Sequence, residues 1–145
     1  MARFSVADRS TGAGSTTLPL FSIFASASVG VKVREIGVFN TATDAAAYAL
    51  RRYTAQGTPG AGLTELQWDE NGDAVTATAF NTHTVTPTFV TGNLRAVTLG
   101  AAAGAGVIWT FGDSGLEIEP GTGNGIGLSV LTGTGQIVDF YMDWD

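Results

Sequence analysis

The feature that most constrains the fold of this chain is a succession of short runs in which apolar and polar residues alternate. The runs extend from about Val29 to Trp144 and are separated by Gly, Thr and Asn-Gly turns. Alternation with a period of two places successive side chains on opposite faces of a strand, whereas an amphipathic helix repeats every three to four residues. The sequence therefore predicts an all-β fold, and many short strands with turns between them are typical of a sandwich or barrel.

Strand patterns recur along most of the chain. The predicted strands are residues 18–25, 29–40, 63–68, 74–80, 85–90, 94–99, 107–111, 116–119, 125–131 and 136–144. The apolar positions change face between Val33 and Ile36, which predicts a β-bulge, with Gly37 as its site. Residues 107–111 are apolar on both faces, which predicts a central strand or a strand covered by a partner.

Residues 43–54 carry two patterns at once. Asp44 is suited to cap a helix, and the Ala and Leu residues that follow it favour one. However, Tyr48 and Leu50 also alternate with their neighbours, and a turn cluster, Gly57-Thr58-Pro59-Gly60, follows. We favour a strand here and keep the helix as the alternative.

The first part of the chain differs in composition from the rest. Phe4 and Val6 alternate briefly, and a stretch rich in Ser, Thr and Gly follows that cannot nucleate a core. We therefore predict an extended N-terminal arm at residues 1–17 and one β-sandwich domain at residues 18–145. A length of 145 residues suits one domain, and the strands after an arm favour a single jelly-roll-like sandwich.

Charge and composition narrow the classes of partner. The chain has 13 acidic and 7 basic residues, and its 14% of charged residues is below the usual ~25%. With 20 glycines and a mean hydropathy of +0.20, part of its surface is expected to be covered by other proteins. Nucleic acid is not an expected partner, because phosphate binding needs clustered basic residues and Arg51-Arg52 is the one adjacent pair. Neither a membrane span nor a signal peptide is expected.

Few side chains could perform chemistry. One His, one Lys and no Cys are present, so we expect no enzyme activity and no cofactor. The segment Asp69-Glu70-Asn71-Gly72-Asp73 resembles the opening of a calcium loop, but Ala74 and Phe80 stand where the loop needs Gly and Glu. No metal site is therefore expected, and the Asn-Gly pair predicts a hairpin between residues 63–68 and 74–80.

A serine hydrolase is the catalytic alternative. Gly112-Asp113-Ser114-Gly115 resembles the nucleophile segment of chymotrypsin-like proteases, and His83 lies upstream as a candidate base. A hairpin turn explains the segment more economically, and His83 is predicted to be a solvent-facing loop residue. The glycine-rich residues 121–127 and 132–135 lack the features of phosphate loops and are predicted to be turns.

Several segments together resemble a known family. They are Arg34-Glu35-Ile36-Gly37-Val38-Phe39-Asn40-Thr41, Leu50-Arg51-Arg52-Tyr53-Thr54, the turn at residues 57–60, and the glycine elements at 125–127 and 132–135. In these patterns the chain resembles small virion proteins of tailed bacteriophages, of the capsid decoration or minor head type. The resemblance implies a homotrimer on the outer surface of a capsid lattice, made in the host cytoplasm, with an arm that clamps neighbouring subunits. The implied partners are the major capsid protein or other virion proteins.

On this hypothesis the chain functions through protein–protein contacts. The candidate interface residues are Phe4, Val6, Val107, Trp109, Phe111, Tyr141 and Trp144. The alternative function is a carbohydrate- or receptor-binding β-sandwich module at a fibre tip, in which exposed aromatic residues stack on a sugar.

Overall fold

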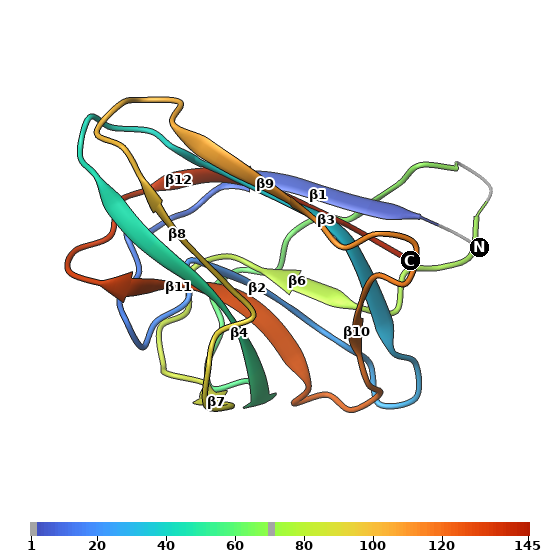
Figure 1. Cartoon of the computed structure of the whole chain (residues 1–145). Helices are drawn as coiled ribbons and strands as arrows, with labels where there is room; N and C mark the ends of the chain where they lie inside the picture. The colour runs from blue at the N-terminus through green and yellow to red at the C-terminus, as the bar shows by residue number, and fades with distance from the viewer. Residues whose placement is uncertain (1–2, 70–71) are drawn as a thin grey trace.

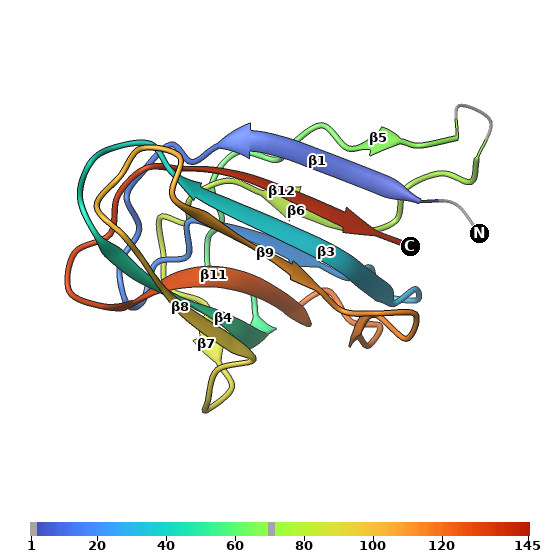
Figure 2. The same ribbon diagram turned by 45° about the horizontal axis from the view of Figure 1, so that its top comes forward.

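The computed structural model describes residues 3–69 and 72–145, and no helix is present in these two ranges. Two antiparallel β-sheets pack face to face (Figures 1 and 2). The strands are β1 (Phe4–Arg9), β2 (Phe21–Phe24), β3 (Val31–Asn40), β4 (Ala46–Ala55), β5 (Leu66–Gln67), β6 (Thr78–Phe80), β7 (Thr88–Phe89), β8 (Arg95–Leu99), β9 (Gly106–Thr110), β10 (Leu116–Ile118), β11 (Gly125–Thr132) and β12 (Val138–Trp144). The prediction of an all-β sandwich is confirmed.

The two sheets are built from strands that are distant in sequence. Sheet A has the order β10-β3-β12-β1-β5, and β9 pairs with β3 as well. Sheet B has the order β6-β2-β11-β4-β7, and β8 pairs with β4. Over its first four strands the chain alternates between the sheets, with β1 and β3 in sheet A and β2 and β4 in sheet B. Most strand pairs are therefore formed by long-range contacts, such as β1 with β12.

The hydrophobic core lies between the two sheets. Strand β12 shows how alternation builds it, because Phe140, Met142 and every second residue of the strand are buried, while the Asp and Tyr residues between them are not. Across the core, the ring of Phe140 stacks on the ring of Phe21 in sheet B at 4.2 Å. The period of two in the sequence thus corresponds to one core face and one outer face.

The prediction of an N-terminal arm is wrong for residues 4–9. These residues form β1, which pairs with β12 along its whole length, from Phe4 opposite Trp144 to Arg9 opposite Asp139. The strand was missed because its hydrogen-bond partner lies at the other end of the sequence, where a local pattern cannot detect it. Residues 10–20 then connect sheet A to sheet B, and Met1 and Ala2 lie outside the described residues.

The ambiguous segment at residues 43–54 forms a strand, so the favoured prediction is confirmed and the helix is wrong. It is β4, which pairs with β11 on one side and with β7 and β8 on the other. Tyr48 and Leu50 face the core, and Ala47 and Ala49 face the opposite side. Hydrogen bonding on both edges of the strand outweighs the high helix propensity of its Ala residues, because tertiary context overrides local propensity.

The predicted bulge is present in β3, but at a different residue. The register against β12 shifts between Glu35 and Val33, so the unpaired residue is Arg34 and not Gly37. The bulge returns Ile36 to the core face that Val33 already occupies, and both side chains are fully buried. The bulge therefore compensates for the change of face in the sequence, so that one face of the folded strand is apolar along its whole length.

The hairpin predicted around Asn71-Gly72 is not formed as expected. Strand β5 pairs with β1 in sheet A, whereas β6 pairs with β2 in sheet B. Within the described residues, the two predicted segments pair only at their outer ends, where Leu63 N donates to Ala79 O and Gly62 forms an antiparallel bridge with Phe80. Glu70 and Asn71, which include the Asn of the predicted turn, lie outside the described residues. A turn signal between two strand patterns does not specify whether the strands join the same sheet.

The outer face of sheet B carries a second, smaller aromatic cluster. Glycines at alternate positions of β11 leave room for it. A Cβ on Gly127 would lie 2.8 Å from the ring of Tyr53, and one on Gly125 would lie 2.4 Å from the ring of Phe24. The ring of Phe89 packs edge-on against Tyr53, and the buried side chain of His83 completes the cluster.

These contacts predict that Gly127→Ala destabilises the fold. The new Cβ would lie 2.6 Å from the carbonyl oxygen of Phe21 as well as against Tyr53, so backbone or ring must move. We expect a loss of about 1–3 kcal/mol in the free energy of unfolding, measured by urea titration. The control is Gly100→Ala, whose Cβ would meet nothing within 4 Å, and its change should stay within about 0.5 kcal/mol. Equal effects of the two variants would contradict the packing argument.

Candidate interaction surface around strand β9

Strand β9 lies at an edge of sheet A, so the first of the two alternatives for residues 107–111, a central strand, is wrong and a strand covered by a partner stays a prediction. It pairs with β3 alone among the strands that the structure describes. The apolar residue on its second face is not buried inside a sheet. Ile108 lies on the outer face of sheet A and is 53% exposed. The opposite face, with Val107 and Trp109, is half-buried at the margin of the core. Both faces of this edge strand thus present apolar side chains.

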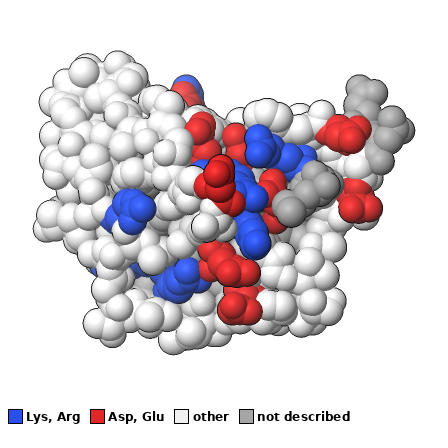
Figure 3. All heavy atoms as spheres, turned by 45° about the vertical axis from the view of Figure 1, so that its right-hand side comes forward, with Lys and Arg blue, Asp and Glu red and all other residues white. Residues whose placement is uncertain are grey.

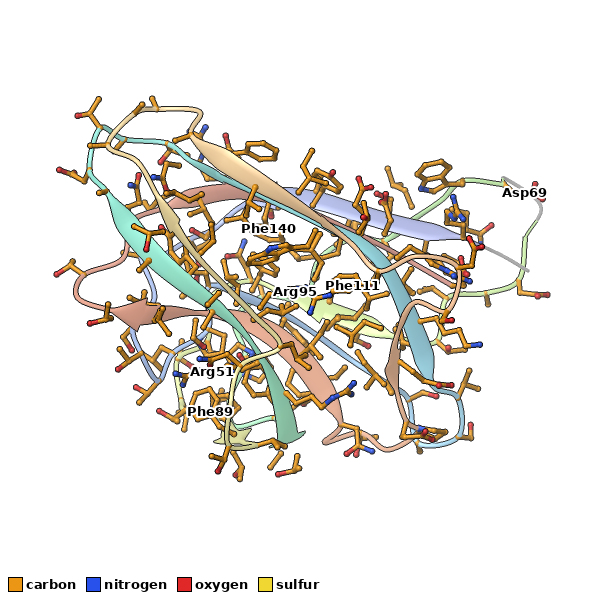
Figure 4. All side chains as sticks on the ribbon, in the orientation of Figure 1. Arg51, Asp69, Phe89, Arg95, Phe111 and Phe140 are labelled. Carbon is orange, nitrogen blue, oxygen red and sulfur yellow. The ribbon has the colours of Figure 1, made fainter. Side chains whose placement is uncertain are left out.

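The inner side of β9 forms the margin between the two sheets. Val107, Trp109 and Phe111 pack against the core from sheet A, and Val97 of β8 does so from sheet B. The guanidinium group of Arg95 lies over the Phe111 ring, 5.4 Å from its centroid, and Figure 4 shows the two side chains together at this opening. A cation–π contact therefore connects the two sheets at this margin, where β8 and β9 are not hydrogen-bonded to each other in the described structure.

The far end of β9 is held by Arg34, the bulge residue of β3. Its Nε donates to Asp145 Oδ2 at 2.6 Å, and its Nη1 donates to the carbonyl oxygens of Gly112 and Asp113 in the turn after β9. The Asp145 carboxylate also forms an ion pair with Arg3 at 3.5 Å. The bulge in β3 thus places a guanidinium group that fixes the turn and with it the position of β9.

On the outer face of sheet A, aromatic rings extend the apolar surface away from β9. The Tyr141 ring lies over Gly37, and the Phe39 ring lies over Gly106, where an added Cβ would be 2.1 and 2.2 Å from the respective ring. The two rings stack at 6.5 Å. We call Phe39, Ile108 and Tyr141 the outer patch. Register places Gly37 between Ile108 and Tyr141 in one row across the sheet.

Ionised groups surround the outer patch. Tyr141 donates a hydrogen bond to Glu35 Oε1, and burial together with the nearby Glu35 and Asp143 carboxylates raises the pKa of Tyr141 to about 12. Arg9 pairs with Asp139 at 2.6 Å, which lowers the pKa of Asp139. The patch is therefore apolar in its centre and charged along β1 and the outer face of β12.

Charge is absent from the sequence around β9. Residues 96–112, which include β9 and most of β8, contain no Lys, Arg, Asp or Glu. Figure 3 shows one face of the molecule, on which charged side chains gather in the centre and on the right, a few basic side chains lie further left, and the upper left is uncharged. The β9 edge is thus a region from which neither sign of charge repels a partner.

Three of the predicted interface residues are not available to a partner. Phe4, Val6 and Trp144 are 6%, 3% and 1% exposed and belong to the core of the chain itself. They face inward because β1 is a strand of sheet A, where Phe4 lies opposite Trp144 with ring centroids 6.0 Å apart. Their assignment to an interface is wrong. Val107, Trp109, Phe111 and Tyr141 remain partly accessible.

Two residues of the outer patch, Phe39 and Ile108, were not among the predicted interface residues. Ile108 and Phe39 lie in the predicted strands, but which face of each strand is covered cannot be read from the pattern when both faces are apolar. The spacing of Gly106 and Ile108 is the sequence signal that could have identified this patch. A glycine two residues before an apolar residue lies on the same face of the strand and leaves room there for an aromatic ring from the next strand. Leu66 and Trp68, at 67% and 60% exposed, were likewise not distinguished from core residues.

The prediction that His83 faces solvent is wrong. The side chain is 2% exposed, and its Nε2 lies 2.6 Å from Ser22 Oγ, with Nδ1 unpaired within the described part of the chain. Burial lowers the pKa of His83, against a smaller opposing effect of the carbonyl groups of Val85 and Gln56. Its aromatic neighbours are Phe24 and Tyr53.

The structure does not bring together the two residues of the hydrolase alternative. Ser114 lies in the exposed turn between β9 and β10 of sheet A, whereas His83 is buried on the outer face of sheet B. The hydroxyl group at hydrogen-bonding distance from His83 belongs to Ser22, which is itself fully buried. The arrangement is consistent with a structural hydrogen bond that satisfies two polar groups in an apolar cluster.

The remaining sequence motifs form turns. Gly121 and Asn124 close a turn before β11, and Gly133, with a φ of 73°, lies in the connection to β12. No group of three or more His, Asp or Glu residues that could hold a metal ion is found in ranges 3–69 and 72–145. No helix within these ranges is long and apolar enough to cross a membrane.

Comparison with known proteins adds no family. No family model, curated protein or solved structure matches the chain. The class that the fold itself defines is an antiparallel β-sandwich of two sheets.

Burial of His83 predicts a pH dependence of stability. Its pKa in the folded state lies below the unfolded value of 6.5, so the unfolded chain binds the proton more tightly. The contribution of neutral His83 is therefore fully present above pH 6.5 and is lost as the pH falls toward the lower folded pKa. We expect the free energy of unfolding to fall between about pH 7 and pH 5, measured by urea titration across this range.

The variant His83→Gln should have a flatter pH profile in this window, even where its overall stability is lower. Asp139→Asn is the control, because the lowered pKa of Asp139 affects stability only as the pH falls through and below its usual value of 3.8. An unchanged slope between pH 7 and pH 5 in His83→Gln would show that another group titrates.

Proposed function

We propose that this chain is a structural virion protein of a tailed bacteriophage that decorates or cements the exterior of the capsid through oligomeric protein–protein contacts. The observation that carries the proposal is the apolar edge of sheet A, formed by β9 and the outer patch. Ile108 is 53% exposed there, in a stretch of 17 uncharged residues from Ala96 to Gly112.

An exposed apolar edge strand is an unusual feature for a protein that works alone. Free β-edges in monomeric proteins carry charged residues, prolines or bulges that prevent pairing with other chains. Strand β9 has the sequence Gly-Val-Ile-Trp-Thr and a regular register against β3. Such a surface is expected where another protein covers it in the functional state.

The order of the strands supports the jelly-roll-like part of the proposal. Sheet A contains the series β1-β12-β3-β10 and sheet B the series β2-β11-β4-β8, with consecutive strands of the first half alternating between the sheets. In each series the strands from the two halves of the chain interleave, as in a double-sheet jelly roll. Viral capsid proteins and lectins are among the proteins that use this architecture.

The resemblance of residues 34–41 and 50–54 to small virion proteins gives the proposal its class. Both segments lie in central strands, β3 and β4, so they concern the scaffold of the sandwich. The partners are then the major capsid protein or other virion proteins, and the location is the capsid surface. A homotrimer is the oligomer that the resemblance implies.

The proposal predicts binding to phage heads. Purified chain, added to heads of the encoding phage assembled without it, should co-sediment and saturate at a stoichiometric ratio to the capsid protein. Phe39→Lys places a charge in the outer patch and should reduce the bound amount by about tenfold or more. The control is Val85→Lys, which places the same charge on an exposed apolar residue away from the outer patch, in the connection between β6 and β7. A dilute monomer without affinity for heads would contradict the proposal.

One observation favours the alternative, a carbohydrate- or receptor-binding module. Trp68 is 60% exposed, and the guanidinium group of Arg3 lies 5.2 Å from the centroid of its ring. The exposed indole offers an apolar face for stacking and the guanidinium group offers hydrogen-bond donors, which are the two kinds of contact that a sugar ring and its hydroxyl groups would use. This function predicts signals on a glycan array that Trp68→Ala abolishes, and an array without signals would dismiss it.

A further inference from the structure

We infer that a second copy of this chain pairs with strand β9 edge to edge, in antiparallel orientation, about a two-fold axis at Ile108. The inference deepens the proposed function, because it names one partner of the β9 surface, and it gives a two-fold dimer of the free chain in place of the homotrimer that the resemblance implies. It does not depend on the presence of a capsid, and it is tested on the purified chain alone.

Within the described part of the chain, the backbone of β9 has unpaired hydrogen-bonding groups in the pattern that such pairing needs. Asn40 N donates to Ala105 O and Phe111 N donates to Arg34 O, so the odd-numbered residues of β9 point their backbone groups at β3. In an antiparallel ladder the residues between them point theirs away. Gly106, Ile108 and Thr110 therefore direct N–H and C=O groups to the open edge, and all three are exposed.

This pattern is self-complementary. With Ile108 opposite Ile108 of the second copy, Gly106 faces Thr110 of that copy, and the reverse pair forms by symmetry. Each facing pair exchanges two hydrogen bonds, as in the hydrogen-bonded positions of any antiparallel ladder. An isologous contact of this kind closes on itself, so it gives a dimer and not an open fibre.

Side chains on both faces of β9 gain cross-strand neighbours in this register. On the outer face, the row Tyr141-Gly37-Ile108 of one copy continues into the same row of the second copy. On the inner face, Val107 of one copy lies opposite Trp109 of the second copy. These are the side chains that a single copy leaves exposed or half-buried.

Electrostatics favour this edge over the rest of the surface for self-association. The chain has a net charge of −6, so most approaches of two copies meet repulsion. The row at Ile108 and the facing pairs of β9 contain no charged residue. The opposite side of sheet A is protected, because β1 ends in Asp8 and Arg9 and the side chain of Asn81 binds both residues there.

The first test is the oligomeric state of the purified chain and of edge variants, by sedimentation velocity over a range of concentrations. The native chain should show a reversible monomer–dimer equilibrium. Ile108→Pro removes the N–H group that faces the second copy, yet leaves the hydrogen bonds to β3 intact. Ile108→Lys brings two ammonium groups together at the axis, and we expect it to raise the dimer Kd by about tenfold or more.

The matched control is Val85→Lys, since Val85 and Ile108 are both 53% exposed. This control should dimerise as the native chain does. Thermal unfolding of each variant shows whether it is folded, and Ile108→Lys keeps the assay informative if Ile108→Pro does not fold. A monomer at all concentrations, or an oligomer that Ile108→Lys leaves unchanged, would overturn the inference.

The second test locates the axis directly. The chain contains no Cys, so Ile108→Cys introduces a single thiol. Facing residues at a hydrogen-bonded position lie about 5.5 Å apart between Cα atoms, which is within the range of a disulfide. Mild oxidation should crosslink Ile108→Cys to a dimer at a concentration where Val85→Cys stays monomeric. Equal crosslinking of the two variants would contradict the two-fold axis at Ile108, whatever the result of the head-binding experiment.

Discussion

The pairing of β1 with β12 is the interaction on which the rest of the sandwich depends. Together with β3, these two strands form the centre of sheet A, and β12 is hydrogen-bonded on both edges. Their inward side chains, among them Phe4, Phe140 and Trp144, form much of the core against sheet B. Because the paired segments are separated by well over a hundred residues, the ladder forms only when the intervening chain is already folded back. The fold is thus defined by long-range contacts.

Glycines have a second structural role beside turns. Gly37 and Gly106 on sheet A, and Gly125 and Gly127 on sheet B, lie under aromatic rings from neighbouring strands. The glycine has no side chain to pack, and the ring restores the lost contact area. The consequence differs between the sheets. On sheet B the rings are buried under the segment around His83, whereas on sheet A they are left at the surface as the outer patch.

The strands of this chain were predictable to different degrees, for physical reasons. Strand β12 alternates over seven residues and was predicted almost to its ends, as was β4, although Ala residues favoured a helix there. Strand β1 was missed because only Phe4 and Val6 carry its pattern. At the candidate site, Val107, Trp109, Phe111 and Tyr141 were found as apolar positions, but Phe4, Val6 and Trp144 were assigned to the wrong environment. Apolar character predicts that a side chain will be covered, and it does not specify whether its own chain or a partner covers it.

The sequence by itself determined that this protein is an all-β sandwich, because a period of two can bury one face of each strand and turn residues limit strand length. It also determined that the region from Ala96 to Gly112 is uncharged. Only the tertiary structure decided that β9 stands at an edge, that its Ile108 faces outward and that His83 is enclosed. These properties depend on which distant strands pair, and pairing is set by the packing of the whole core. A local pattern contains no information about that choice.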